Sequence, residues 1–410
     1  MTSYKLAAID VHKKMLAVVV ADVAQDEWEL ERRKFGTAAS ELKVLEEWLA
    51  TREVREAEME STAQYWKPVW QQLEGRYRLQ LAQAHWNRAP RGRKRDFEDA
   101  ERLLRRYVAG EWILSFVPDP EQRLWRTLTR SQQQLMRDRV RLHSQVESLW
   151  EDAKIKLATV VSDLLGVSSR RMREALADGE TDPTALAALA EPGLRATPEQ
   201  LADVLHAAVT MSALHRKVLR LFLDRLDLIE RQIQTLPETT ASAMQAHQQA
   251  IMRLTAVPGF GVDSAQQVIA EVGPQAATFD SAAQLASWVG VCPGREESAE
   301  VSKSNRTPKG NRALRRILSQ SANAAIRAKG SIFQSMYRRL VPRMGHNKTI
   351  WAIAHRLCRL AWIILHQHAE YVEYGKERDA KAAQRRTATL IRTLRALGYQ
   401  VIPPTPKIAT

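Results

Sequence analysis

Four acidic residues near the start of the chain have the types and spacing of a metal-dependent phosphoryl-transfer site. Asp10 and Glu60 each close a predicted strand, and Asp96 and Asp99 stand three residues apart at the start of a predicted helix, on one face. Carboxylate oxygens that converge from separate elements suit Mg²⁺, and paired Mg²⁺ ions stabilise both the attacking and the leaving oxygen at phosphorus. Each acid alone also fits an ordinary structural role, as a turn, surface, helix-cap or first-turn residue.

The elements that carry these acids follow the order of an RNase H-like fold. Apolar periodicity predicts strands and helices in alternation, with strands at 4–10, 15–20, 28–35, a short one ending at 60, and 77–82, and helices at 39–50, 64–74 and from 96. Three leading strands followed by alternating helices and strands are typical of this α/β class. We therefore assign residues 1–117 to an N-terminal RNase H-like domain.

The rest of the chain is predicted to be mostly helical. Leucines recur every seventh residue from Leu128 to Leu149, and apolar residues from Leu219 to Leu236 alternate steps of three and four, which is typical of a coiled coil. We predict a coiled-coil region over 118–245, interrupted near 160–200 by a small helical insertion rich in Pro and Gly. A helical domain over 246–375 and a tail over 376–410 complete the chain.

A strongly basic segment dominates the C-terminal half. Residues 301–369 contain no Asp or Glu, and the formal net charge of the chain is +14. The cations nearest the start of this segment are Lys303, Arg306, Lys309, Arg312, Arg315 and Arg316. Because solvated surfaces usually mix both signs of charge, we expect nucleic-acid contact here, with a membrane or an acidic protein surface as the alternative.

Two other segments are candidates for holding DNA phosphates. A basic run directly precedes Asp96 and contains Arg91, Arg93, Lys94 and Arg95. Residues 254–269 resemble a helix-hairpin-helix, in which a turn with Gly259 and Gly261 leaves backbone amides free for a phosphate. An ordinary helix-helix turn explains the second segment equally well.

Cysteine and hydropathy patterns exclude other classes. The chain has two cysteines without metal-ligand spacing, so neither a zinc site nor a disulfide framework is indicated. Its most apolar stretch, residues 350–365, is interrupted by a histidine and two arginines and is too short for a membrane span. We therefore expect a soluble, cytosolic protein without a membrane partner.

Several motifs resemble the DEDD transposases of the one-ten family of insertion sequences, and the similarity covers most of the chain. The resembling segments are 8–13 (AIDVHK), 59–70 (MESTAQYWKPVW), 92–100 (GRKRDFEDA), 257–261 (VPGFG), 288–299 (WVGVCPGREESA) and 309–316 (KGNRALRR). The resemblance implies a RuvC-like domain whose DEDD set falls on Asp10, Glu60, Asp96 and Asp99. It also implies a C-terminal transposase domain whose nucleophilic serine falls on Ser298, although the residues after it depart from the family pattern and leave Ser302 and Ser304 as competitors.

Members similar to this chain cut and rejoin DNA through a phosphoserine link, and several use a structured guide RNA. The resemblance therefore implies DNA as partner, in a bacterial or archaeal cytosol at the nucleoid, with a guide RNA as an additional candidate partner. Because no His–Asp relay stands near Ser298, we expect Mg²⁺ on the four acids to polarise the phosphate that the serine attacks. The long separation in sequence requires either folding back of the domains or a site shared in a homodimer or homotetramer.

Two rival functions remain open on the sequence alone. A Mg²⁺-dependent nuclease similar to Holliday-junction resolvases needs the acids but not the serine. A non-catalytic nucleic-acid-binding regulator needs neither, since its acids are only caps and turns.

Overall fold

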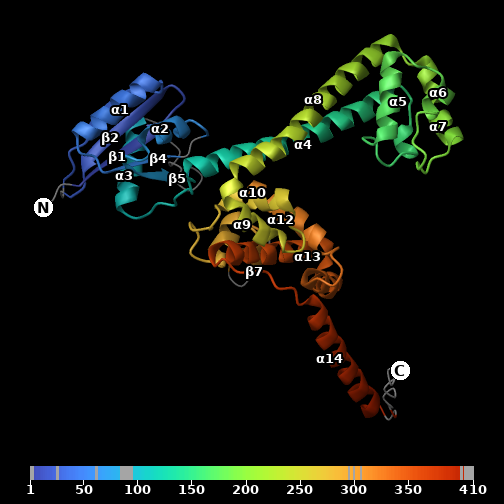
Figure 1. Ribbon diagram of the computed structural model, residues 1–410. Coiled ribbons are helices and arrows are strands. Elements are labelled where there is room, and N and C mark those ends of the chain that lie inside the picture. The colour runs from blue at the N-terminus through green and yellow to red at the C-terminus, as the bar shows by residue number, and fades with distance from the viewer. Residues whose placement is uncertain are drawn as a thin grey trace. The chain divides into compact units, whose positions relative to one another are not determined.

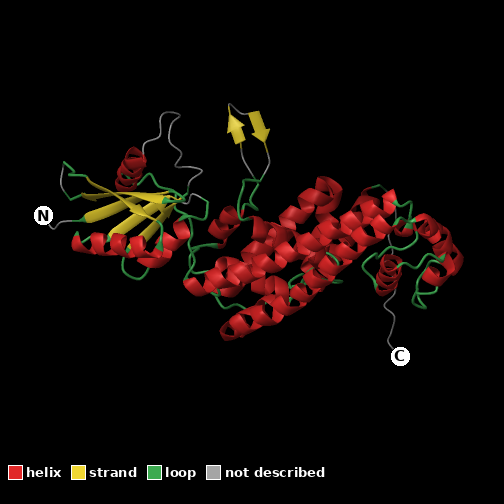
Figure 2. Cartoon of the chain, turned by 90° about the horizontal axis from the view of Figure 1, so that it is seen from above, coloured by secondary structure: helices red, strands yellow, loops and turns green. Residues whose placement is uncertain are grey.

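The computed structural model separates into two compact units, Met1–Pro118 (unit 1) and Asp119–Thr410 (unit 2). It describes residues 4–24, 27–60, 63–83, 96–293, 296–298, 301–304, 307–397 and residue 400. Unit 1 contains a mixed sheet with helices, and unit 2 is almost entirely helical among these residues (Figures 1 and 2). This agrees with the predicted α/β domain followed by a mostly helical remainder, and it fits the RNase H-like class.

Unit 1 is built on a five-stranded sheet in the order β3-β2-β1-β4-β5. The elements in chain order are β1 (Lys5–Val11), β2 (Met15–Asp22), β3 (Glu31–Gly36), α1 (Ala39–Thr51), β4 (Glu56–Glu60), α2 (Trp66–Leu73), β5 (Arg78–Ala82) and α3 (Asp96–Val108). The first three strands are antiparallel, whereas β4 runs parallel to both β1 and β5. All eight predicted elements are present, with ends shifted by a few residues.

Helices cover both faces of this sheet. Leu45 and Leu49 of α1 and Leu73 of α2 pack with Ile9 and other apolar strand residues on one face. Ala100, Leu103 and Leu104 of α3 pack with Leu6, Ala8 and Val19 on the other face. Because side chains alternate along a strand, both faces of β1 and β2 are mainly apolar, as expected for strands that are covered on both sides.

Unit 2 begins with two long helices that pack against each other, α4 (Pro120–Asp152) and α8 (Ala213–Ala243). The Asp119 carboxylate accepts a hydrogen bond from the Gln122 amide and fixes the start of α4. Between them lie η1 (Leu157–Thr159), α5 (Val167–Asp178), α6 (Pro183–Ala187), α7 (Pro198–Leu205) and η2 (His206–Thr210), which share a core with the ends of the long helices. A coiled coil in the strict sense remains a prediction.

The remainder of unit 2 is a second group of helices with one short hairpin. Its elements are η3 (Gln245–His247), α9 (Gln248–Thr255), α10 (Val262–Val272), α11 (Ala282–Val289), β6 (Glu296–Ser298), β7 (Val301–Ser304), α12 (Arg312–Ala325), α13 (Ile332–His366) and α14 (Gly375–Ala396). The antiparallel β6–β7 pair, visible in Figure 2, was not predicted. Helix α13 has a break at Gly345, whose φ of 72° is outside the helical region. Among the described residues, no helix combines the length and apolar character of a membrane span.

Candidate active site

The strand register of unit 1 brings Asp10 and Glu60 to one edge of the sheet. Strands β1 and β4 are parallel, and the last pair in their register joins Ile9 to Met59, so Asp10 and Glu60 are the next residue on each strand. Leu6 and Ala8 face α3, and the two-residue period of a strand puts Asp10 on that same face. Since Ala8 pairs with Glu58 in register, Glu60 also follows on the face toward α3.

Helix α3 supplies the other two predicted acids to this face. It begins at Asp96, and its first turn carries Asp96, Glu98 and Asp99. Acids are favoured there because the first turn of a helix has the positive end of the helix dipole. Ala100 and Leu104 anchor the helix on the sheet and thereby hold its first turn near the end of β1.

Among the described residues, one group of potential metal ligands combines Asp10, His12 and Asp96, whose donor atoms all lie within 4.8 Å of one another. The His12 Nε2 atom lies 2.9 Å from Asp10 Oδ2 and 3.5 Å from Asp96 Oδ1. From β3, Lys34 donates a hydrogen bond of 2.8 Å from its Nζ to Asp96 Oδ2. Two groups that can carry positive charge therefore contact these two carboxylates.

Negative charge accumulates around Asp10. Burial raises the pKa of the Asp10 carboxyl, and the charges of Asp99 and Asp96 raise it further, while His12 acts in the opposite direction. The pKa of Asp96 is lowered, mainly by the hydrogen bond from Lys34. We call Asp10, Asp96 and Asp99 the acid cluster; a divalent cation placed among them would relieve the repulsion that Asp10 experiences.

Glu60 and Asp99 belong to this region without contributing an atom to the group of potential metal ligands found among the described residues. The Asp99 carboxylate lies 3.3 Å from the guanidinium of Arg102, one turn later on α3. Glu60 is placed next to Asp10 by the strand register. The structure thus brings Asp10 and Asp96 into direct proximity, with Asp99 in electrostatic range and Glu60 on the adjacent strand.

His12 is the site residue that the sequence analysis did not assign. It lies just past β1, two positions after Asp10. The signal was the alternation of Asp10, an apolar residue and His12 at a strand end, which directs both polar side chains to the same side when the chain stays extended.

Two further glutamates of β4 lie deeper on the face toward α3. Glu56 accepts hydrogen bonds from Tyr4, Tyr107 and Arg78, and although burial opposes ionisation, these bonds lower its pKa overall. Glu58 is 2% exposed, and no hydrogen-bond partner is found for either of its oxygens among the described residues. Burial, followed by the charge of Glu56, raises the pKa of Glu58 well above its ordinary value, which favours the protonated carboxyl.

Several predicted site residues lie outside the described parts of the chain. These are Arg91, Arg93, Lys94, Arg95 and Arg306, together with the side chains of Ser298, Ser302, Ser304 and Lys303. For the serines, the backbone forms the β6–β7 hairpin, in which Ser298 pairs with Val301. The role of each of these residues remains a prediction.

The turn between α9 and α10 packs tightly within unit 2. Gly259 has a φ of 98°, and a Cβ atom there would come within 2.3 Å of the Ser321 carbonyl oxygen on α12. The Gly261 amide donates a hydrogen bond of 2.8 Å to Ser264 Oγ. This bond occupies one of the amides that a helix-hairpin-helix would offer to a phosphate, and DNA contact by the turn remains a prediction.

Among the predicted basic residues, Arg315 differs from its neighbours. Its guanidinium donates to the Gly290 carbonyl and to Thr307 Oγ1, and it stacks over the ring of Trp351 at 4.5 Å from the centroid. Lys309 and Arg312 are exposed, and Arg316 is half-buried. Arg315 therefore has internal partners, whereas Lys309 and Arg312 face solvent.

Comparisons with known proteins agree with the resemblance found in the sequence. Residues 7–154 match a model described as "Transposase", for the DEDD type of IS110, and residues 252–338 match one described as "Transposase IS116/IS110/IS902 family". The chain is also 27% identical over 177 residues to the "Insertion element IS900 uncharacterized 42 kDa protein" of Mycobacterium paratuberculosis. That match spans 43% of this chain and 44% of the relative, less than half of its length. With the acid cluster in the first matched segment, these findings show that the chain belongs to the IS110 family of insertion-sequence transposases.

Proposed function

We propose that this chain cuts and rejoins DNA as the recombinase of an insertion sequence. The observation that carries the proposal is the acid cluster at the end of β1, where Asp10 and Asp96 approach each other in a segment that matches DEDD transposases. Carboxylates in this arrangement suit phosphoryl transfer, since they can hold the cations that neutralise charge at phosphorus.

Asp10, Glu60, Asp96 and Asp99 are the residues that would hold Mg²⁺. The donor set fits, because it offers carboxylate oxygens, and the raised pKa of Asp10 reflects burial and a local excess of negative charge that a cation would offset. When bound, the metal supplies Lewis-acid stabilisation of the reacting phosphate. In the absence of metal, His12 orients Asp10 through its 2.9 Å contact. Lys34 holds Asp96 in the same way from β3.

Ser298 is the proposed nucleophile. Its Oγ forms a bond to phosphorus while the bond from phosphorus to the departing strand end breaks, and the serine proton passes to solvent or to that leaving oxygen. The resulting phosphoserine ester conserves the energy of the phosphodiester, so a second strand end rejoins without ATP. The family membership and the position of Ser298 in the matched WVGVCPGREESA motif support this role.

The same proposal includes the partners expected from the resemblance. DNA of the element ends and of the target is the substrate, and a structured RNA from the flank of the element is a candidate guide. A homodimer or homotetramer would provide the several cleavages that strand exchange requires.

The test is detection of a covalent protein–DNA adduct. The full chain is incubated with Mg²⁺, labelled element-end DNA and flanking RNA, then denatured and separated by electrophoresis. We expect an adduct with the wild type and none with Ser298→Ala. Ser319→Ala, a serine on α12, serves as the matched control and should form the adduct normally.

Each alternative outcome has a distinct meaning. An adduct that survives Ser298→Ala and disappears in Ser302→Ala or Ser304→Ala moves the nucleophile within the hairpin and refutes the assignment of Ser298. Cleavage without any adduct, unchanged in Ser298→Ala, identifies a metal-dependent nuclease. DNA that is bound but left intact with Mg²⁺ under all conditions identifies a regulator.

A further inference from the structure

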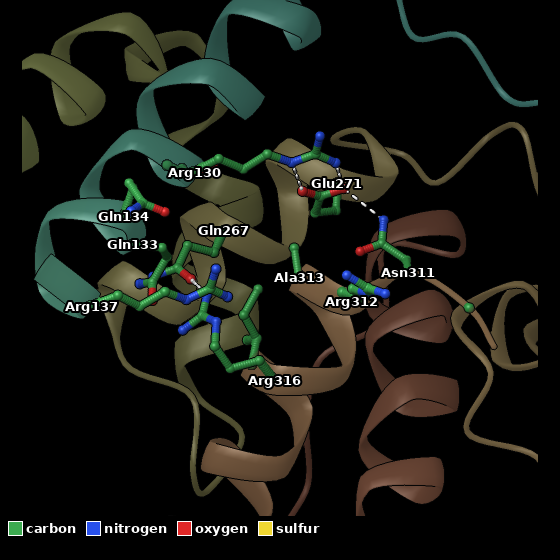
Figure 3. A pocket seen from close by; sticks show the side chains of 13 residues that line it. Arg130, Gln133, Gln134, Arg137, Gln267, Glu271, Asn311, Arg312, Ala313 and Arg316 are labelled. Atoms are coloured by element: carbon green, nitrogen blue, oxygen red, sulfur yellow. Dashed lines mark hydrogen bonds and ion pairs between the residues drawn. The ribbon is translucent and has the colours of Figure 1, made fainter. Parts of the chain in front are cut away.

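A polar pocket of about 540 Å³ lies within unit 2, between α4, α10 and the start of α12 (Figure 3). Four arginines project into its lining, namely Arg130, Arg137, Arg312 and Arg316. Among the lining residues, Glu271 is the one carboxylate, and most of the other polar groups are neutral amides. We call this feature the arginine pocket.

The Glu271 carboxylate is held in the pocket by several hydrogen bonds and an ion pair. Its carboxylate accepts two hydrogen bonds of 2.8 Å from Arg130 and one of 2.7 Å from Asn311 Nδ2. Arg126 adds an ion pair at 3.5 Å. Burial of Glu271 acts to raise its pKa, but the bonds from Arg130 and the charge of Arg126 lower it overall. Glu271 is therefore ionised, and two arginines already compensate its charge.

Within the described part of the chain, no carboxylate forms an ion pair with any of the other three arginines. Arg316 donates to Gln267 Oε1 at 2.8 Å and to Gln320 Oε1 at 3.1 Å, both of which are neutral. Burial lowers the pKa of Arg316, and the charge of Arg137 lowers it further, an effect that Asp263 and Glu271 oppose without reversing. Figure 3 shows the side chains of Arg137 and Arg316 close together. Arg137 and Arg316 thus hold two positive charges near each other, and the positive charge at this position is not fully balanced by carboxylates.

The surrounding groups keep these donors in place. Asp263 Oδ2 accepts a hydrogen bond of 2.6 Å from Gln267 Nε2, which turns the Gln267 oxygen toward Arg316. Asn311 Oδ1 caps α12 by accepting from the Leu314 amide at 3.0 Å, while its Nδ2 contacts Glu271. The pocket is therefore supported by hydrogen bonds between α4, α10 and α12, and little reorganisation is needed to admit an anion.

An anion with several oxygens fits this arrangement. Guanidinium groups donate paired N–H bonds that match the geometry of a phosphate, and three of them can share one. The start of α12, a helix of 14 residues, adds the positive end of its dipole at Arg312. We propose that the arginine pocket binds a phosphate of the DNA backbone, an inference that rests on the proposed function.

A polyanion is favoured over a free anion by the charge next to the pocket. Exposed Lys309 precedes Arg312, and the segment that begins at residue 301 contains no acid until Glu370. Each further phosphate that contacts this surface releases condensed counterions and adds affinity, which a single small anion does not gain.

The test compares two arginines on consecutive turns of α4 in the full chain. Arg137→Gln removes a charge from the pocket, whereas Arg141→Gln removes the same charge outside it, where Arg141 is exposed and pairs with Asp138. Binding to a fluorescent element-end duplex is measured by anisotropy over a series of salt concentrations. We expect Arg137→Gln to weaken DNA binding roughly tenfold and to reduce the salt slope by about 1. The change for Arg141→Gln should be less than about twofold.

The outcomes of this binding experiment, together with measurements on RNA and on inorganic phosphate, show which part of the proposal is wrong if the expected result is not obtained. If the wild type itself does not bind DNA, both the proposed function and this inference fail. If it binds and the two variants are equivalent, the pocket assignment alone is refuted. A loss confined to an RNA ligand would overturn the choice of DNA. A Tm increase with inorganic phosphate at matched ionic strength that requires Arg137, together with unchanged DNA affinity, would identify a free-anion site.

A folding control keeps the result interpretable. Circular dichroism and thermal unfolding are recorded for every variant, and Arg137→Lys keeps the charge while losing the paired donors. We expect the lysine variant to recover the salt slope but only part of the affinity. If Arg137→Lys is as weak as Arg137→Gln although both are folded, the contact is not ionic and the inference is wrong.

Discussion

The acid cluster of unit 1 and the arginine pocket of unit 2 both hold like charges close together, but they differ in how those charges are compensated. Around the acid cluster, Asp10 and Asp96 are compensated by His12 and Lys34, whose side chains are 47% and 51% exposed. Arg102, whose side chain is 24% exposed, compensates Asp99. In the arginine pocket, the compensating group is Glu271, whose side chain is 2% exposed and bonded on several sides. The groups that balance the acid cluster thus lie nearer the surface, whereas the carboxylate that balances the arginine pocket is part of the core.

This difference indicates which charges are available to a ligand. Exposed ion pairs contribute little to stability, so an incoming cation can replace the contacts of His12 and Lys34 at small cost. Breaking a buried pair leaves an uncompensated charge and is strongly unfavourable. An anion entering the arginine pocket would therefore leave the Glu271 pairs intact and bind to the remaining arginines. The contacts that balance the acid cluster can therefore be exchanged for a ligand, whereas the Glu271 ion pairs of the arginine pocket are retained.

The sharpest test of the acid cluster is Asp10→Asn. Removal of this carboxylate eliminates a metal ligand, and we expect the initial rate of DNA strand cleavage to fall roughly a thousandfold. DNA affinity should be unchanged or slightly higher, because one negative charge is lost. Glu101→Gln on the same helix as Asp96 is the matched control, since Glu101 contacts Arg32 rather than the cluster. Equal cleavage by Asp10→Asn and Glu101→Gln would remove the acid cluster from the reaction.

Glu271→Gln tests whether the buried ion pairs of Glu271 in the arginine pocket stabilise the folded protein. Loss of this charge leaves Arg126 and Arg130 without their buried partner, and we expect the free energy of unfolding to fall by about 3–5 kcal/mol. Urea unfolding of the full chain followed by circular dichroism measures the change. Glu191→Gln breaks an ion pair with Arg171 in which both side chains are about half exposed, and it should cost less than about 1 kcal/mol.

The pH dependence of stability gives the same comparison without a mutation. Because the folded-state pKa of Glu271 is lowered, its contribution is complete above the unfolded glutamate pKa of about 4.3 and is lost as the pH falls through the folded value. Wild type should therefore lose more stability than Glu271→Gln on acidification below that pH. An equal loss of stability in the wild type and in Glu271→Gln would show that the buried partners of Glu271 do not stabilise its ionised form.

The acid cluster was largely predictable from sequence because its determinants are local. Asp10 and Glu60 stand at or near the ends of predicted strands, and Asp96 opens a predicted helix, so the order of the elements already singled out these acids. The arginine pocket was not predictable as a unit. Glu271 is one acid in an apolar helix, and Arg130, its bidentate partner, stands 141 residues away. Only the packing of α4, α10 and α12 brings them together.

The hairpin β6–β7 was missed for a different reason. Its strands are 3 and 4 residues long, too short to show the alternation of apolar and polar residues that identifies a strand. The segment is also polar, with Glu296, Glu297 and Ser298 in succession. Ser298 was singled out there by the family resemblance, and its role remains a prediction.

Glu58 extends the comparison to a buried acid whose carboxylate oxygens have no hydrogen-bond partner among the described residues. Its folded-state pKa is raised, so the folded protein keeps a proton that the unfolded chain releases above a pH of about 4.3. Stability is therefore lost as the pH rises from that value toward the folded pKa, the opposite of the Glu271 case.

We expect the stability of Glu58→Gln relative to the wild type to increase from pH 5 to pH 8, because the amide has no proton to hold. Calorimetry of the full chain at both pH values measures the difference. Glu47→Gln, an exposed acid on α1, should change neither value appreciably. If the difference in stability between the wild type and Glu58→Gln does not vary with pH, then Glu58 is ionised and paired. Burial in unit 1 would then not by itself keep this carboxyl neutral.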